Sequence, residues 1–304
     1  MTFNIEAGNT DLRAKYYDKT LKNLAPVMYK FKQALTIDTT SAWKNFFWRE
    51  DPTVLSPASG PGIRGLAPGA QFAQATQKMS QIQAVIDKYG LEQQIIWEDI
   101  LTNDVDIQAR ALFKIAEGIA HTVDDQIYAV LSDADTSSSI LVYNLGGNKT
   151  VTQGSTYGGT GGGWNQTSSA FIDDLLAGQQ LMAENNIDAT GLILYLNPRD
   201  VRSAKKYITD KGAQFNSFSN DVAVNGSMGG AVGITFVSSN SVPVSRALLV
   251  KPKVCGTWKS LVPLQSTTIE DKFRNVTVRA VEEGVCQLYQ PLAVVLFKGT
   301  NITQ

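Results

Sequence analysis

The stretch that decides the fold is "DKFRNVTVRAVEEGV", at Asp271–Val285. Within it, apolar side chains at Val276, Val278 and Ala280 alternate with polar ones. A period of two is typical of a β-strand that buries one face and exposes the other. The run that follows, "QLYQPLAVVLFKGT", predicts another strand, with Pro291 at its start or on an edge. The C-terminal part of the chain is therefore predicted to form sheet.

The first of these strands carries two adjacent glutamates, Glu282 and Glu283. Neighbouring residues of a strand point to opposite faces, so these two cannot act as an acid/base pair on one substrate. We expect one of them to be buried against an arginine, Arg274 or Arg279, and the other to meet solvent. The pattern favours a sheet element with ion-pairing ends over an active site.

The composition indicates a globular protein without a strong charge bias. The 304 residues are 43% hydrophobic and 18% charged, and 27 basic and 28 acidic residues give a formal net charge of −1. This balance argues against a protein whose main task is to neutralise nucleic-acid phosphates, but not against one that surrounds nucleic acid. The longest apolar run, Leu292–Phe297, is too short to cross a bilayer, and no signal peptide is evident, so no membrane association is expected.

Few residues are available for nucleophilic or metal chemistry. His121 is the one histidine, and Cys255 and Cys286 are the one pair of cysteines, which we expect to be free thiols. A metal cluster and a histidine-based hydrolase site are therefore disfavoured. The glycine cluster Gly158–Gly163 lacks the Lys-Ser/Thr of a phosphate-binding loop and predicts an ordinary loop. We expect no cofactor, no metal and no enzymatic activity.

The N-terminal half alternates helical and extended patterns. Residues 10–37 read as helix, and residues 56–69 are too rich in Pro, Gly and Ser for regular helix. Residues 70–90 read as an extended arm that returns to the body of the protein. An excursion with so little apolar content is either mobile or received by another subunit. Residues 102–131 carry one apolar stripe at helical spacing and predict a spine helix about 40 Å long.

The stretch "SAWKNFFWREDP" concentrates four aromatic side chains: Trp43, Phe46, Phe47 and Trp48. Two interpretations stay open for them. They fill the core of their own domain, or they belong to an arm that docks on a neighbouring chain, because aromatic residues are enriched at interface centres.

The remaining segments alternate strands and helices irregularly. A small strand is expected near Ile140–Tyr143, a helix from Phe171, a buried strand within Gly191–Asp200, a helix over "VRSAKKYI", and two short strands broken at Pro243. No dinucleotide fingerprint accompanies them. This pattern predicts an α+β fold with a mixed sheet.

The run "DKFRNVTVRAVEEGVCQLYQPLAVVLFKGT", with "GITFVSSNSVPVSRALLV" and "LILYLNPRD" before it, resembles the major capsid proteins of tailed double-stranded DNA bacteriophages. The resemblance implies the Hong Kong phage-type capsid fold, with an N-terminal arm, an extended loop, a spine helix in a peripheral domain and a mixed-sheet axial domain. The implied boundaries are 1–50 for the arm, 51–92 for the loop, 93–131 for the peripheral domain with the spine helix, 132–255 for the axial domain, 256–286 for the peripheral strands and 287–304 for a C-terminal strand returning to the axial domain.

The resemblance also implies a function and partners. The chain would assemble with itself as pentamers and hexamers into an icosahedral shell around double-stranded DNA, without sequence-specific binding. It would be assembled in the host cytoplasm and reside in the virion capsid. A separate scaffolding protein and a portal are the implied partners. The residues expected between subunits are Trp43, Phe46, Phe47, Trp48, Arg64, Phe72, Arg274, Glu282 and Glu283.

Some members of this family cross-link a loop lysine to an asparagine with the help of a glutamate. Asn275 and Glu282 match the asparagine and the glutamate, but Gln74 stands where the lysine is expected and Lys78 lies four residues further on. We therefore expect structural roles for these residues and no catalytic site.

Two alternatives to the capsid interpretation remain. An encapsulin-like nanocompartment shell with the same fold would package a protein cargo, and purified particles distinguish it by their contents. An intracellular enzyme that binds phosphate through Gly158–Gly163 is a weaker alternative.

Overall fold

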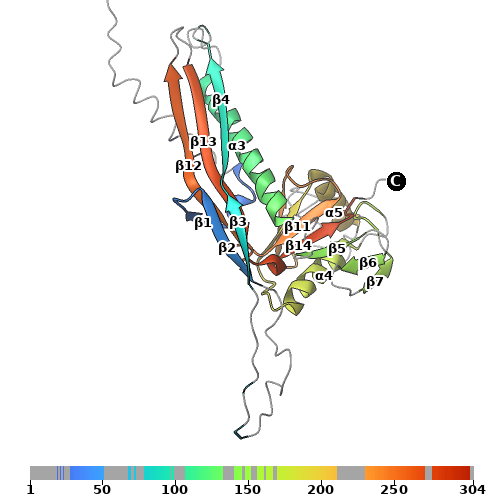
Figure 1. Cartoon of the computed structure of the whole chain (residues 1–304). Coiled ribbons are helices and arrows are strands. Elements are labelled where there is room, and N and C mark those ends of the chain that lie inside the picture. The colour runs from blue at the N-terminus through green and yellow to red at the C-terminus, as the bar shows by residue number, and fades with distance from the viewer. Residues whose placement is uncertain are drawn as a thin grey trace, which may run out of the picture.

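The computed structural model describes residues 28–50, 79–96, 107–132, 140–145, 148–151, 156–160, 162–166, 170–210, 230–270 and 276–301, together with positions 19, 21, 23, 68, 69, 72 and 98. The fold is mixed α+β, as predicted. A four-stranded sheet with a long helix beside it lies at one end of an elongated molecule, and an eight-stranded sheet lies at the other (Figure 1).

The four-stranded sheet has the strand order β1-β12-β13-β4. Its centre is the antiparallel pair of β12 (Gly256–Glu270) and β13 (Val276–Leu288). β4 (Asp87–Ile95) runs antiparallel to β13, and β1 (Thr36–Thr39) runs parallel to β12. Val278 and Ala280 of β13 are buried and Arg279 between them is exposed, so the alternation in the sequence predicted this strand correctly.

The helix beside this sheet is α3 (Ile107–Leu131), which is about 38 Å long at 1.5 Å per residue. Its apolar stripe, including Ile115, Ile119 and Val123, packs in one cluster with Val278 and Ala280 of β13. The predicted spine helix is therefore confirmed, and its expected capping residues at 102–106 lie outside the described residues. None of the helices in the described ranges combines the length and the hydropathy needed to cross a bilayer.

The eight-stranded sheet has the order β7-β6-β5-β14-β11-β8-β10-β9. The bounds of its strands are β5 Leu141–Asn144, β6 Asn148–Val151, β7 Thr156–Thr160, β8 Leu192–Leu196, β9 Gly230–Ala231, β10 Ile234–Ser238, β11 Arg246–Val250 and β14 Val294–Lys298. The pairs β5-β14 and β8-β10 are parallel and the other pairs are antiparallel, so the sheet is mixed, as predicted.

The two faces of the eight-stranded sheet pack against different partners. Along β8, Leu192, Leu194 and Leu196 join the cluster that contains buried residues of α4 (Phe171–Glu184) and α5 (Pro198–Asp210). Tyr195 points to the opposite face and joins the cluster that contains α3. Residues of β11 and β14 alternate between the two clusters in the same way, so the central strands β8, β11 and β14 are buried on both faces and separate α4 and α5 from α3.

Two local predictions were wrong, and one confirmed helix begins earlier than predicted. The helix predicted over residues 10–37 does not reach its expected end, because Lys32–Ala34 form a 3₁₀ turn and β1 follows it. Pairing with β12 supplies the backbone hydrogen bonds that a helix would otherwise provide. Gly158 and Gly159 lie in β7 and not in a loop. The helix predicted over "VRSAKKYI" begins earlier, at Pro198, where proline suits the first turn of a helix.

A pair of glycines in neighbouring strands provides a test of the four-stranded sheet. A Cβ atom at Gly284 of β13 would lie 2.5 Å from Cζ2 of the buried Trp258 and 2.9 Å from the Lys259 carbonyl oxygen. At Gly90 of β4 the nearest atom would be 3.5 Å away, which is an ordinary contact. Gly284→Ala should therefore lower the free energy of unfolding by about 1–3 kcal/mol through overpacking, whereas Gly90→Ala should not lower it. Chemical denaturation at one fixed protein concentration measures both, and equal effects would contradict this packing.

Candidate functional site

Glu282 is fully buried in β13 and forms the centre of a polar joint. Its Oε2 accepts a hydrogen bond from the Tyr29 hydroxyl, and its Oε1 accepts one from the Lys32 ammonium group, with which it forms an ion pair. The expected arginine partner was wrong. Arg279 pairs instead with Glu92 on the exposed side, at 2.7 Å between Nη2 and Oε2, and Arg274 lies outside the described residues.

The Lys32 ammonium group is held by aromatic rings as well as by the carboxylate. Its Nζ lies 4.4 Å from the centroid of the Tyr29 ring and 5.1 Å from that of Trp258. Both distances are within the range of cation–π attraction. Burial, followed by the negative charge of Glu282, raises the pKa of Tyr29 well above its ordinary value, so its hydroxyl stays a donor. Glu282 is thus a compensated buried charge with two donors from its own chain.

A second buried carboxylate, Asp124 of α3, holds the backbone of the same segment. Its Oδ2 accepts the Lys30 N–H at 2.8 Å and its Oδ1 accepts the Phe31 N–H at 3.1 Å. Burial raises the pKa of Asp124 to about 6, although the backbone N–H donors favour the charged form. These donors would have no helical or strand partner of their own, because they precede the 3₁₀ turn at Lys32.

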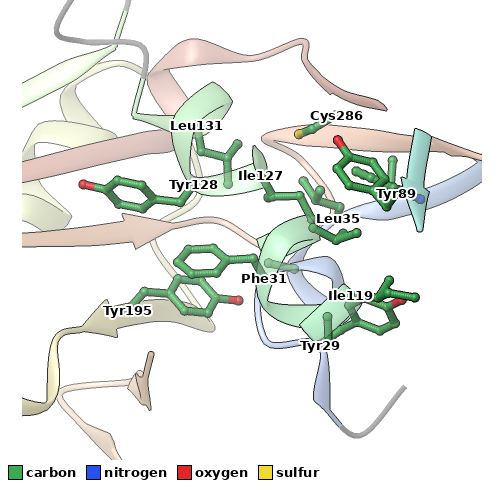
Figure 2. Close-up of a cluster of buried hydrophobic side chains, with 14 of the residues drawn as sticks. Tyr29, Phe31, Leu35, Tyr89, Ile119, Ile127, Tyr128, Leu131, Tyr195 and Cys286 are labelled. Atoms are coloured by element: carbon green, nitrogen blue, oxygen red, sulfur yellow. The ribbon is translucent and has the colours of Figure 1, made fainter. Parts of the chain in front are cut away.

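The same segment also contacts the eight-stranded sheet. The Phe31 ring stacks on Tyr195 of β8 with centroids 4.0 Å apart and an interplanar angle of 20°. The Tyr195 hydroxyl donates to the Lys30 carbonyl at 3.1 Å. Figure 2 shows Phe31 and Tyr195 together, with Tyr128, Ile127 and Leu131 of α3 in the same cluster. We call Tyr29–Leu35 the joint segment, because it contacts both sheets and α3.

Glu283, the neighbour of Glu282, has a different environment. Its side chain is 14% exposed and lies 3.6 Å from Nζ of Lys88, which is itself 62% exposed. One glutamate is therefore buried and compensated, and the other forms a weak pair at the surface. The two carboxylates point to opposite faces of β13, as the strand period requires.

The four clustered aromatic residues divide between the two interpretations. β2 (Lys44–Glu50) and β3 (Met79–Val85) form an antiparallel pair, which we call the hairpin. Phe47 is buried and packs with Ala84, Ile86 and Val285 against the body of the protein. The exposed fractions of Phe46 and Trp48, on the opposite face of β2, are 60% and 54%.

This outer face of the hairpin carries four exposed apolar side chains, with Gln81 and Gln83 of β3 between the apolar residues of that strand. Phe46 pairs in register with Gln83, and Trp48 pairs with Gln81. Paired residues lie on the same face of the hairpin, and so do alternate residues of β3, so Met79 and Val85 lie on the face of Phe46 and Trp48. Met79 and Val85 are also exposed, as are the neighbouring Trp43 and, further along the chain, Phe72. Figure 1 shows β2 and β3 side by side at the lower end of the four-stranded sheet. Arg64, Lys78 and Asn275, the other expected contact and cross-link residues, lie outside the described residues.

The residues that catalysis would need are not assembled in the described part of the chain. His121 is exposed on α3 and pairs with Asp125 at 2.9 Å between Nδ1 and Oδ2. Cys255 and Cys286 are buried free thiols, and burial raises the pKa of Cys255 to about 12 and that of Cys286 well above its ordinary value. Within the described ranges, no three His, Cys, Asp or Glu side chains are grouped so as to hold a metal ion.

Glu282 and its sequence neighbour allow a matched test of the joint. Glu282→Ala leaves the Lys32 ammonium and the Tyr29 hydroxyl without their acceptor, so the free energy of unfolding should fall by about 1–3 kcal/mol. Glu283→Ala removes only a surface pair and should cost less than about 1 kcal/mol. Denaturant titration of both variants, and of Lys32→Met alone and combined with Glu282→Ala, measures the coupling. Equal small losses without coupling between positions 282 and 32 would show that the ion pair does not hold the joint.

Comparisons with known proteins place the fold. A family model described as phage capsid protein matches residues 79–295, which is more than half of the chain. A comparison with curated protein sequences finds no match. Among solved structures, the capsid of the cyanophage P-SCSP1u is similar at 14% identity with a TM-score of 0.64, covering 90% of this chain and 89% of that one.

Two further solved structures have the same fold. A chain of Mycobacterium phage Che8 is 12% identical with a TM-score of 0.63, covering 90% of this chain and 92% of that one. The virus-like particle from Pyrococcus furiosus is 10% identical with a TM-score of 0.59, covering 94% and 99%. The predicted Hong Kong phage-type capsid fold is thereby confirmed, and the protein is structural and not an enzyme. The chain belongs to the phage capsid protein family.

Proposed function

We propose that this protein is the major capsid subunit of a tailed bacteriophage, which assembles as pentamers and hexamers into an icosahedral shell around double-stranded DNA. The observation that carries the proposal is the outer face of the hairpin. Phe46, Trp48, Met79 and Val85 expose large apolar side chains on one continuous strand pair. Such a face is costly in water, and contiguous apolar patches mark interaction sites.

A second copy of the chain is the occupant we propose for this face. The inner face of the hairpin already packs against Val285 through Phe47. Its outer face remains exposed, and among the described residues the body of the protein does not cover it. A stable contact between subunits buries about 1,200–2,000 Å² in total, which this face, Trp43 and Phe72 together would help to supply.

The two sheets fit different positions in such a shell. We assign the four-stranded sheet and α3 to the peripheral domain and the eight-stranded sheet, with α4 and α5, to the axial domain. The return of β14 to the centre of the eight-stranded sheet, between β5 and β11, supports the assignment of the C-terminal strand to the axial domain. A separate scaffolding protein and a portal complete the proposed set of partners.

Glu282 has a structural role in this proposal. Both of its carboxylate oxygens are engaged by Tyr29 and Lys32 of its own chain, and burial separates it from solvent. A general base for cross-linking would need an oxygen that is open to the reacting lysine. The proposed shell is therefore held by non-covalent contacts.

Assembly of hairpin variants tests the proposed contact. Phe46→Ser and Trp48→Ser should leave the fold intact, because neither side chain is buried, but should reduce the yield of closed shells at least tenfold. Gln83→Ser is the matched control, since Gln83 lies opposite Phe46 in register and is polar. Circular dichroism checks the fold and electron microscopy counts the shells. Normal shells from both aromatic variants would contradict the contact.

The contents of purified particles test the rest of the proposal. An encapsulin-like shell is the second candidate, and the similarity over 99% of the Pyrococcus furiosus virus-like particle chain is the reason to test it. Particles from infected or induced host cells should contain double-stranded DNA that resists added nuclease until the shell is opened. A packaged protein and no protected DNA would favour the nanocompartment instead.

A further inference from the structure

The solvent side of α5 carries a row of three cations that the fold itself does not use. Arg199, Arg202 and Lys206 are spaced three and four residues apart, which places them on one side of the helix. The opposite side of α5 is buried through Ala204 and Ile208. Within the part of the chain that the structure describes, none of the three cations forms an ion pair.

These cations line a surface hollow of about 740 Å³. Gln166 and Asn301 contribute amide side chains to its lining, and Asp210 contributes the one carboxylate among the described lining residues. The hollow lies on the side of the eight-stranded sheet that α4 and α5 cover, away from α3 and the joint segment. It is thus separate from both the hairpin and the Glu282 joint.

We infer that this hollow binds a ligand with several linked phosphate groups. Like charges three and four residues apart on a helix repel one another, so a polyanion that bridges them is favoured. Arginine presents a planar fork of donors that matches phosphate oxygens, and amide side chains add further donors. At 1.5 Å per residue, the three cations extend over about 10 Å along α5.

That extent selects linked phosphates over a single ion. One phosphate ion cannot contact all three cations across this distance, whereas the successive phosphates of a linked ligand can each meet one of them. DNA and free polyphosphate both offer this chemistry. Arginine also pairs with carboxylates, so an acidic peptide is the alternative ligand that the tests below separate from linked phosphates. The inference goes beyond shell assembly, since binding can be measured on chains that form no shell.

Titration calorimetry on the purified full chain tests the site, with tripolyphosphate, orthophosphate, a short DNA duplex and a tetraglutamate peptide as probes. Tripolyphosphate should bind at least tenfold more tightly than orthophosphate or tetraglutamate. For the duplex, three phosphate contacts predict a slope of about −2.7 in a plot of log K against log salt concentration. A competition titration distinguishes the two sources of linked phosphate. If the duplex displaces tripolyphosphate, DNA binds in the same hollow; if it does not, free polyphosphate is the ligand of the hollow. Either result supports the site.

Variants separate the site from a general charge effect. Arg202→Gln should weaken tripolyphosphate binding at least fivefold and reduce the salt slope for the duplex by about 0.9, whereas Arg202→Lys should keep the slope because it keeps the charge. Arg110→Gln is the control, since Arg110 is an exposed arginine of α3 outside the hollow. Equal losses in Arg202→Gln and Arg110→Gln, tetraglutamate binding as tight as tripolyphosphate, or no binding of linked phosphates would overturn the inference. If the protein forms shells but does not bind linked phosphates, this inference alone is overturned. If it binds linked phosphates but never forms shells, only the proposed function is overturned.

Discussion

The structure depends on two buried carboxylates that hold one short segment of chain. Glu282 binds the side chains of Tyr29 and Lys32, and Asp124 binds the backbone N–H groups of Lys30 and Phe31. Burying a carboxylate is costly unless donors replace the lost water, and here all the donors come from the joint segment. If the segment detached, both carboxylates would lose their hydrogen-bond donors while surrounded by an apolar cluster that includes α3 and strands of both sheets. This constraint fixes the position of the two sheets relative to each other.

The eight-stranded sheet and the hairpin use burial differently. The central strands of the eight-stranded sheet are covered on both faces, by α4 and α5 on one side and by α3 and the joint segment on the other. The hairpin has only its inner face packed against the protein. A core that is complete within the chain and a strand pair that is covered on one face only suit a subunit that is rigid by itself and completed by neighbours. That is the physical basis of the proposed shell.

Sequence patterns predicted the elements whose burial repeats with a regular period. The alternation around Val278 and the stripe of α3 were confirmed, because each depends on which face meets the core. The partner of Glu282 was not predictable, since Lys32 lies 250 residues away in the chain. The proposed Arg279 was excluded by the strand period itself, because residues three apart in a strand point to opposite faces. Asp124 gave a signal that was missed: it is an acidic residue within an apolar stripe, between Val123 and Ile127, where a buried charge implies a specific donor. For the four aromatic residues, the sequence left two interpretations open, and only the packing of Phe47 against Ala84 and Val285 separates it from the exposed Phe46 and Trp48.

Hydrogen exchange at the backbone amides of Lys30 and Phe31 tests the central role of the joint segment most directly. If the two carboxylates hold this segment as part of the common core, these amides should exchange only through global unfolding. Their protection should then equal that of the amides at the centre of β13 and β8. Asp124→Ala should abolish the protection at Lys30 and Phe31 and lower that of both sheets. Fast exchange at Lys30 and Phe31 in the native protein, with both sheets still fully protected, would show that the segment opens by itself and does not join them.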